Sequence, residues 1–193
     1  MTENAKDYVT VVSGLPRSGT SLMMQMLAAG GMSVLTDQVR APDADNPRGY
    51  YEFEPVKQTR QDPSWLTAAP GKAVKMVHLL LYDLPRGYSY RVILMRRRLD
   101  EVLASQRAML ERQGKKGANL PDPQLAKVFQ GQLEKLDQWL PTQPNFRVLS
   151  VSYNELLQDP AAAARAVNRF LDGRLDVDAM TRAVDPALYR QRR

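Results

Sequence analysis

The stretch Gly14-Leu15-Pro16-Arg17-Ser18-Gly19-Thr20-Ser21 decides the fold of this chain. It follows a β-branched run over residues 8–13 and leads into an apolar, helix-forming segment over residues 22–27. Glycines at both ends of the loop let the backbone turn its amides toward a ligand, and the helix directs its positive N-terminal end at the same point. This order of strand, glycine-bounded loop and helix predicts a phosphate-binding nest.

The loop has the glycine spacing of a nucleotide-binding P-loop, with one departure. Thr20 stands before Ser21 at the position where that loop carries a lysine. Kinases and NTPases use the lysine on the β- and γ-phosphates, so its absence favours a nucleotide whose reactive end is bound differently. Arg17 supplies a positive charge three residues earlier. A plain strand-to-helix connection is the alternative, and residues elsewhere in the chain must decide between them.

Residues 16–21 resemble the phosphosulfate-binding loop of the sulfotransferases, whose usual form is Pro-Lys-Ser-Gly-Thr-Thr. The resemblance implies 3′-phosphoadenosine 5′-phosphosulfate (PAPS) as sulfuryl donor and adenosine 3′,5′-bisphosphate as product. It assigns the donor's 5′-phosphate to Gly14, Pro16, Arg17, Ser18, Gly19, Thr20 and Ser21. Arg17 falls on the family's catalytic lysine, and because arginine does not readily release a proton, electrostatic stabilisation of the leaving group is expected from it rather than acid catalysis.

A second strand-to-helix connection follows a buried strand predicted over residues 92–95. We call this connection, with Arg97 and Ser105, the second corner, and the loop 14–21 the first. A helix is predicted over Asp100–Arg112, and Ser105 lies eight residues after Arg97. In the sulfotransferases an arginine and a serine with this spacing bind the 3′-phosphate, which the resemblance implies for Arg97 and Ser105. A guanidinium offers phosphate a planar fork of donors, and a hydroxyl two helical turns further on can close over it. Without the resemblance, a solvated arginine cluster at a strand end would be the better interpretation.

His78, the only histidine, is the first candidate for the general base. Its ordinary pKa of about 6.5 suits deprotonation of an acceptor hydroxyl. In cytosolic sulfotransferases a Lys-Thr-His sequence at a comparable place supplies a lysine and the basic histidine. Here the order Lys75-Met76-Val77-His78 is one residue longer, and one residue moves a side chain to the other face of a strand. A core histidine is the alternative.

Glu52 and Glu54 are the competing candidates. They lie in the segment Asn46–Glu54, which resembles one found in bacterial sulfotransferase-like proteins. Burial in a partly enclosed loop can raise a carboxyl pKa toward neutrality. For either residue the alternative is a surface carboxylate paired with Arg48 or Lys57.

The resemblance extends from Val9 to about Leu171. It includes the passage from Ser152 to Pro160, whose residues, Tyr153 among them, are expected to be structural. Leu22 departs from it, since the family often has a tryptophan against the adenine there. The family's C-terminal Arg-Lys-Gly passage is also missing, and the tail over residues 189–193 is simply basic.

Composition sets limits on the function. A chain of 193 residues, 44% hydrophobic and 25% charged, fits a single soluble domain over residues 1–193. The lack of cysteine excludes disulfides, thiol nucleophiles and cysteine metal sites. The polar N-terminus and the lack of a long apolar run predict a cytoplasmic protein without a membrane span. The net charge of +6 favours an anionic partner, while an aromatic content of 7% and the lack of a recognisable module argue against nucleic acid.

The predicted fold class is α/β, a three-layer P-loop-type fold with a mainly parallel central sheet flanked by helices. A short strand is expected over residues 32–35, a loop-rich acceptor region over 36–72, a strand over 73–78, a mobile loop over 113–122, helices over 123–140, 161–171 and 176–183, and a strand over 146–151. PAPS would lie across the carboxyl ends of the strands.

The predicted function is sulfuryl transfer from PAPS to a hydroxyl or amine of a small-molecule or glycan acceptor, with no metal. Two alternatives stay open. One is a P-loop kinase or NTPase, in which Asp83 at the end of an apolar run would be a weak candidate to hold magnesium. The other is a catalytically degenerate module that binds PAPS or another nucleotide and transfers nothing.

Overall fold

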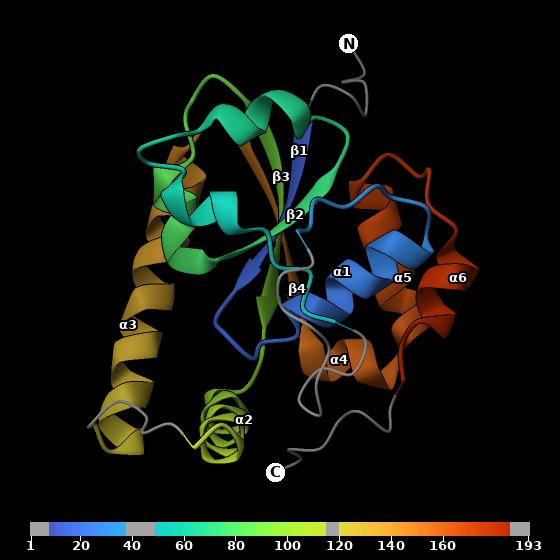
Figure 1. Cartoon of the computed structure of the whole chain (residues 1–193). Coiled ribbons are helices and arrows are strands. Elements are labelled where there is room, and N and C mark those ends of the chain that lie inside the picture. Colours follow the sequence, from blue (N-terminus) through green and yellow to red (C-terminus); the bar gives the residue numbers. More distant parts are fainter. Residues whose placement is uncertain (1–7, 38–48, 115–119, 186–193) are drawn as a thin grey trace.

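A computed structural model describes residues 8–37, 49–114 and 120–185. Its centre is a parallel sheet with the strand order β2-β1-β3-β4 (Figure 1). The strands are β1 (Tyr8–Gly14), β2 (Ala73–Val77), β3 (Ser89–Arg96) and β4 (Phe146–Ser152). Because the strands are parallel, their carboxyl ends share one edge of the sheet, where Gly14 is paired with Val77 on one side and with Met95 on the other.

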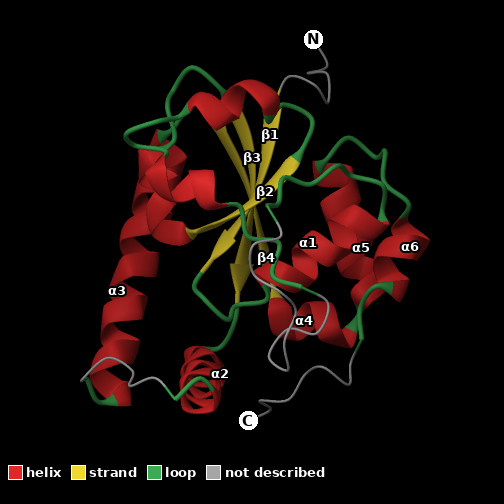
Figure 2. Cartoon of the chain, in the orientation of Figure 1, coloured by secondary structure: helices red, strands yellow, loops and turns green. Residues whose placement is uncertain are grey.

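Helices cover both faces of the sheet (Figure 2). The α-helices are α1 (Thr20–Ala29), α2 (Leu99–Arg112), α3 (Asp122–Trp139), α4 (Tyr153–Gln158), α5 (Pro160–Phe170) and α6 (Val177–Arg182), and the 3₁₀ helices are η1 (Glu54–Gln58), η2 (Ser64–Ala68), η3 (His78–Asp83) and η4 (Leu140–Thr142). In Figure 1, α1, α5 and α6 lie on one side of the sheet and α3 on the other. The predicted three-layer α/β class is therefore confirmed.

Successive side chains of β1 point to opposite faces of the sheet and belong to two separate hydrophobic cores. Tyr8 and Val12 pack with α1, α5 and α6, whereas Val9 and Val11 pack with η2, η3 and α3. Every residue of β1 is buried. A strand covered on both faces has no polar face, which explains the continuous apolar run in the sequence.

Two predicted strands differ from the structure. The stretch 32–35 forms only an isolated bridge, between Val34 and Ala73, because the chain touches β2 at one point before turning away. The strand predicted over 73–78 stops at Val77, and His78 begins η3. Three other expectations lie wholly or partly outside the described residues: the segment 46–48, residues 115–119 of the loop 113–122 and the tail 189–193.

A buried charge cluster joins the opposite end of the sheet to the end of α5. The Arg91 guanidinium donates to Asp172 Oδ1 at 2.7 Å and to the Phe170 carbonyl at 2.6 Å. It also lies 4.0 Å from the centre of the Tyr8 ring, and the Tyr8 hydroxyl donates to Asp172 Oδ2 at 3.1 Å. Burial of the Tyr8 hydroxyl raises its pKa to about 12. The cluster is structural, since it lies at the end of β3 away from the loop 14–21.

Candidate active site

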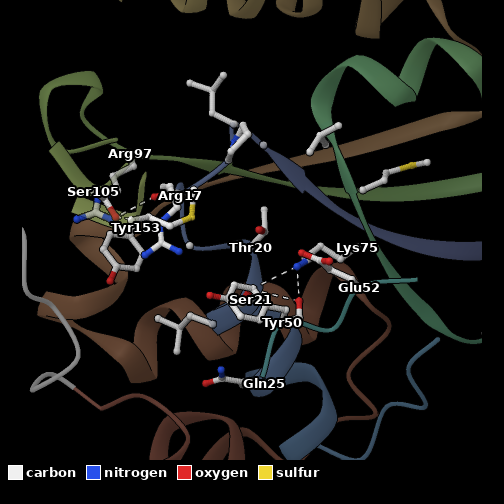
Figure 3. Close-up of a pocket in the computed structure, with 18 of the residues that line it drawn as sticks. Arg17, Thr20, Ser21, Gln25, Tyr50, Glu52, Lys75, Arg97, Ser105 and Tyr153 are labelled. Atoms are coloured by element: carbon white, nitrogen blue, oxygen red, sulfur yellow. Dashed lines mark hydrogen bonds between the residues drawn. The ribbon is translucent and has the colours of Figure 1, made fainter. Parts of the chain in front are cut away.

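A cavity of about 360 Å³ opens at the carboxyl ends of β1, β2 and β3 (Figure 3). Its size lies within the range of about 300–1,000 Å³ that small-molecule sites occupy. The lining includes nine of the residues predicted from the sequence: Gly14, Pro16, Arg17, Gly19, Thr20, Ser21, Glu52, Arg97 and Ser105. Three predicted residues, Ser18, Glu54 and His78, are not part of it.

The loop 14–21 depends on its two glycines. Gly19 has a φ of +98°, and a Cβ built there would come within 2.3 Å of Tyr153 Cδ2. At Gly14 a Cβ would meet Ser18 Oγ at 2.5 Å and the Met95 carbonyl oxygen at 2.7 Å. Only glycine fits both positions, because each backbone passes directly against a packed neighbour. The tight packing brings the N-terminus of α1, at Thr20 and Ser21, to the cavity wall.

Ser18 lies beneath the loop rather than in the cavity. Its side chain is buried, and its amide donates to the Leu15 carbonyl at 3.1 Å. We therefore assign Ser18 no contact with the donor: its side chain packs under Gly14 and its amide closes a turn.

The two predicted phosphate corners meet in this cavity. The Arg17 Nε donates to Ser105 Oγ at 2.9 Å, across 88 positions of sequence. An Arg97 terminal nitrogen donates to the Arg17 carbonyl oxygen at 3.1 Å. Figure 3 shows Arg17, Arg97 and Ser105 at the same end of the cavity. One ligand can therefore touch both corners.

Arg97 is held in place by buried partners. Its Nε donates to Glu101 Oε2 at 2.9 Å, and both side chains are almost completely buried. The other oxygen of Glu101 accepts a hydrogen bond from Asn154 Nδ2 at 3.0 Å. The guanidinium also lies 4.5 Å from the centre of the Tyr153 ring. A buried cation with a carboxylate and an aromatic face around it has a fixed orientation before any ligand binds.

Lys75 is a site residue that the sequence did not predict. From β2 its Nζ reaches Ser21 Oγ at 3.4 Å and donates to the Tyr50 carbonyl, which also accepts from Ser21 Oγ at 3.3 Å. A cation therefore stands beside Ser21, next to the position where the P-loop lysine is missing. Two signals were present in the sequence: the partial resemblance to Lys-Thr-His, which also supplies a lysine, and the position of Lys75 as the only charged residue in the strand Ala73–Val77.

His78 lies away from the cavity. Lys75, Met76 and Val77 at the end of β2 line the cavity, whereas the His78 Nε2 lies 3.0 Å from Gln132 Oε1 of α3, in the opposite layer. Burial lowers the pKa of His78. The one-residue difference from Lys-Thr-His thus separates the lysine from the histidine, and we assign His78 no catalytic role.

Glu52 and Glu54 also lie in different places. Glu54 forms an ion pair with Lys57, with an O–N distance of 2.5 Å, on an exposed part of η1. This pair is the alternative that the sequence had left open. Glu52 lines the cavity, as Lys75 does, so of the three predicted base candidates it is the one that faces the site.

The charge of the lining favours an anion. Among the described residues it contains five cations and two carboxylates: Arg17, Lys57, Lys75, Arg97 and Arg112, with Glu52 and Asp185. An enclosed wall of one sign concentrates ligands of the other sign. The cavity can therefore hold a ligand with several negative charges.

Comparison with known proteins identifies the family of this chain. No helix in the described parts of the chain combines the length and the apolar character that crossing a membrane needs. The search of curated proteins finds no match. Among solved structures, an unliganded sugar kinase from Janibacter sp. HTCC2649 matches with 15% identity and a TM-score of 0.47, over 94% of this chain and 97% of its own. The model of the sulfotransferase domain matches residues 7–191, nearly the full length, and the chain therefore belongs to the sulfotransferase domain family.

Proposed function

We propose that the protein transfers a sulfuryl group from PAPS to a hydroxyl or amine of a small-molecule acceptor. The observation that carries the proposal is the meeting of two phosphate-binding corners in one cavity, through Arg17 and Ser105. A donor with phosphates at both ends of its ribose needs two such corners, whereas ATP needs one.

The donor's charged groups are assigned to the lining as follows. The loop 14–21, apart from Ser18, and the N-terminus of α1 bind the 5′-phosphosulfate, because helix amides and a positive dipole favour an anion there. Arg97 and Ser105 bind the 3′-phosphate. Arg17, which lies between the corners and holds Ser105, neutralises charge on the nucleotide.

In the reaction the acceptor oxygen or nitrogen forms a bond to sulfur while the bond from sulfur to the 5′-phosphate oxygen breaks. The acceptor proton goes to the Glu52 carboxylate, and the electron pair of the broken bond stays on the leaving bisphosphate. Lys75 beside Ser21, together with Arg17, stabilises the negative charge that develops there. Preorganised donors of this kind are worth on the order of 100- to 1000-fold in rate each.

The acceptor end of the cavity is apolar. Five side chains from η1, β2, η3 and the segment before η1 line it: Phe53, Val56, Met76, Val77 and Leu80. These side chains offer a saccharide no hydrogen-bond partners, and polar groups that lose water without partners weaken binding. An acceptor with an apolar body and one reactive hydroxyl or amine fits this wall better than a glycan does.

Calorimetry tests the donor assignment. We expect adenosine 3′,5′-bisphosphate to bind more tightly than ATP with magnesium, and tighter binding of ATP would favour the kinase alternative. Radiolabelled PAPS, incubated with naphthols, aliphatic alcohols, arylamines and saccharides, then tests transfer. Binding of the bisphosphate without labelled product from any of these would support a module that binds nucleotide only.

A further inference from the structure

Tyr153 touches both phosphate-binding corners. It is the first residue of α4, immediately after β4, and its side chain is 8% exposed. The Arg97 guanidinium lies over the ring face, 4.5 Å from the ring centre. The ring edge fills the space beside Gly19, so that a Cβ on Gly19 would come within 2.3 Å of Tyr153 Cδ2. Figure 3 shows the ring beside Arg97 and Arg17. A single rigid side chain from a third element thus lies between the loop 14–21 and the start of α2.

The backbone under Tyr153 is fixed independently of its ring. The Ser152 hydroxyl accepts a hydrogen bond from the Glu155 amide at 3.2 Å, which caps α4. The next residue, Asn154, donates to Glu101, the ion-pair partner of Arg97. The ring is therefore attached to a fixed backbone through few rotatable bonds, so it can hold Arg97 and Gly19 at a set distance from each other.

We propose that Tyr153 is a positioning residue that sets the distance between the two corners and so makes the cavity selective for a nucleotide with both a 3′- and a 5′-phosphate. The inference rests on the proposed function and goes beyond it. Sequence resemblance predicted only a structural residue here, whereas the contacts give Tyr153 a role in ligand selection. The role is exerted through Arg97 and Gly19 and needs no contact between Tyr153 and the reacting atoms.

The test compares two nucleotides in four proteins. Affinities for adenosine 3′,5′-bisphosphate and adenosine 5′-phosphate are measured by calorimetry in the unmodified protein, Tyr153→Phe, Tyr153→Leu and Tyr82→Leu. The last variant makes the same change at a tyrosine that is 39% exposed and does not line the cavity. Tyr153→Met, whose longer and more flexible side chain adapts better to the space left by the ring, replaces Tyr153→Leu if circular dichroism shows that the leucine variant is unfolded.

We expect the affinity ratio between the two nucleotides to fall by about tenfold in Tyr153→Leu, since a desolvated cation–ring contact and a fixed corner distance are lost together. Tyr153→Phe keeps the ring and should keep the ratio within about twofold, as should Tyr82→Leu.

Three results would overturn the inference alone: an unchanged ratio in Tyr153→Leu, an equal loss of affinity for both nucleotides, or the same drop in ratio in Tyr153→Phe. Failure of the unmodified protein to bind either nucleotide would instead remove the proposed function and this inference with it.

Discussion

The Arg97 guanidinium donates a hydrogen bond to the main-chain carbonyl of Arg17 at 3.1 Å. The contact joins a strand end to a loop 80 positions earlier in the sequence, and it ties both to the same cavity wall. Since Arg97 also pairs with the buried Glu101, its position is set by the protein rather than by a ligand.

Replacing Arg97 by alanine should weaken adenosine 3′,5′-bisphosphate about 10- to 100-fold and adenosine 5′-phosphate much less, because our proposal assigns Arg97 to the 3′-phosphate, which only the bisphosphate has. Calorimetry with both nucleotides measures this. The change also leaves Glu101 buried without its cation, which typically costs about 3 kcal/mol of stability. The double variant Arg97→Ala with Glu101→Gln controls for that loss, and equal weakening of both nucleotides would remove the 3′-phosphate assignment.

Replacing Lys75 by methionine keeps the length of the side chain and removes its charge. We expect kcat to fall about 100-fold, with a much smaller change in bisphosphate affinity, because the role proposed for Lys75, beside Ser21, is to stabilise charge that develops in the transition state. Lys57→Met is the matched control, since Lys57 also lines the cavity but is 60% exposed and paired with Glu54. Similar losses of kcat in both variants would show that the cavity needs only general positive charge.

Replacing Glu52 by glutamine removes the proposed base without changing its shape. The rate of sulfuryl transfer should fall at least about 100-fold while bisphosphate affinity stays the same, since proton transfer by a positioned group contributes about that much. Glu54→Gln, on the exposed side of η1, should change the rate little. If His78→Gln reduced kcat as much as Glu52→Gln and left the fold intact, the base would have to be reassigned.

The buried His78 makes stability depend on pH. Burial lowers its pKa in the folded chain below the value of about 6.5 in the unfolded chain, so the unfolded chain takes up the proton first. The stabilising contribution is complete above about pH 6.5 and is lost as the pH falls through and below that value. Urea unfolding near pH 7.5 and pH 5.5 should therefore show a smaller loss in His78→Gln than in the unmodified protein. Equal losses would mean that other groups cause the pH dependence.

Replacing Asp172 by asparagine tests the cluster at the far end of the sheet. Asp172 has a φ of 67°, which asparagine tolerates, so the variant removes the charge without backbone strain. Burial opposes ionisation of Asp172, but the donors on Arg91 and Tyr8 outweigh it and lower its pKa. Without that carboxylate the buried Arg91 loses an ion-pair partner at 2.7 Å, and we expect a loss of about 2 kcal/mol in the free energy of unfolding. Bisphosphate affinity should not change, and a large change would show that the two ends of the sheet are coupled.

Local patterns in the sequence were sufficient for much of the fold. The β-branched run of β1, the glycine-bounded loop and α1 were all predicted, because strand and helix propensities and glycine positions act over a few residues. The second corner was predicted differently: local patterns gave the strand and the helix around Arg97 and Ser105, but only the resemblance to the sulfotransferases implied a phosphate site there.

Local patterns could not predict which of the three base candidates and Lys75 face the cavity. Which of Lys75 and His78 faces the cavity depends on where β2 stops, and that is set by its pairing with β1 through Gly14 and Val77. Glu54 lies outside the cavity and is paired with Lys57, a contact that the sequence allowed but did not require. Tyr153 lies at the cavity because β4 places the start of α4 against Gly19 and Arg97.

The sequence by itself determined that this chain has a glycine-bounded loop between a strand and a helix, a basic segment after another strand and a parallel α/β sheet to carry them, because each of these depends largely on neighbouring residues. Only the tertiary structure decided which side chains share the cavity: Lys75 and Tyr153 enter it and His78 is turned into the opposite layer. The reason is that strand pairing and the packing of helices against each face place residues far apart in the sequence side by side, and a shift of one residue along a strand reverses the face on which a side chain lies.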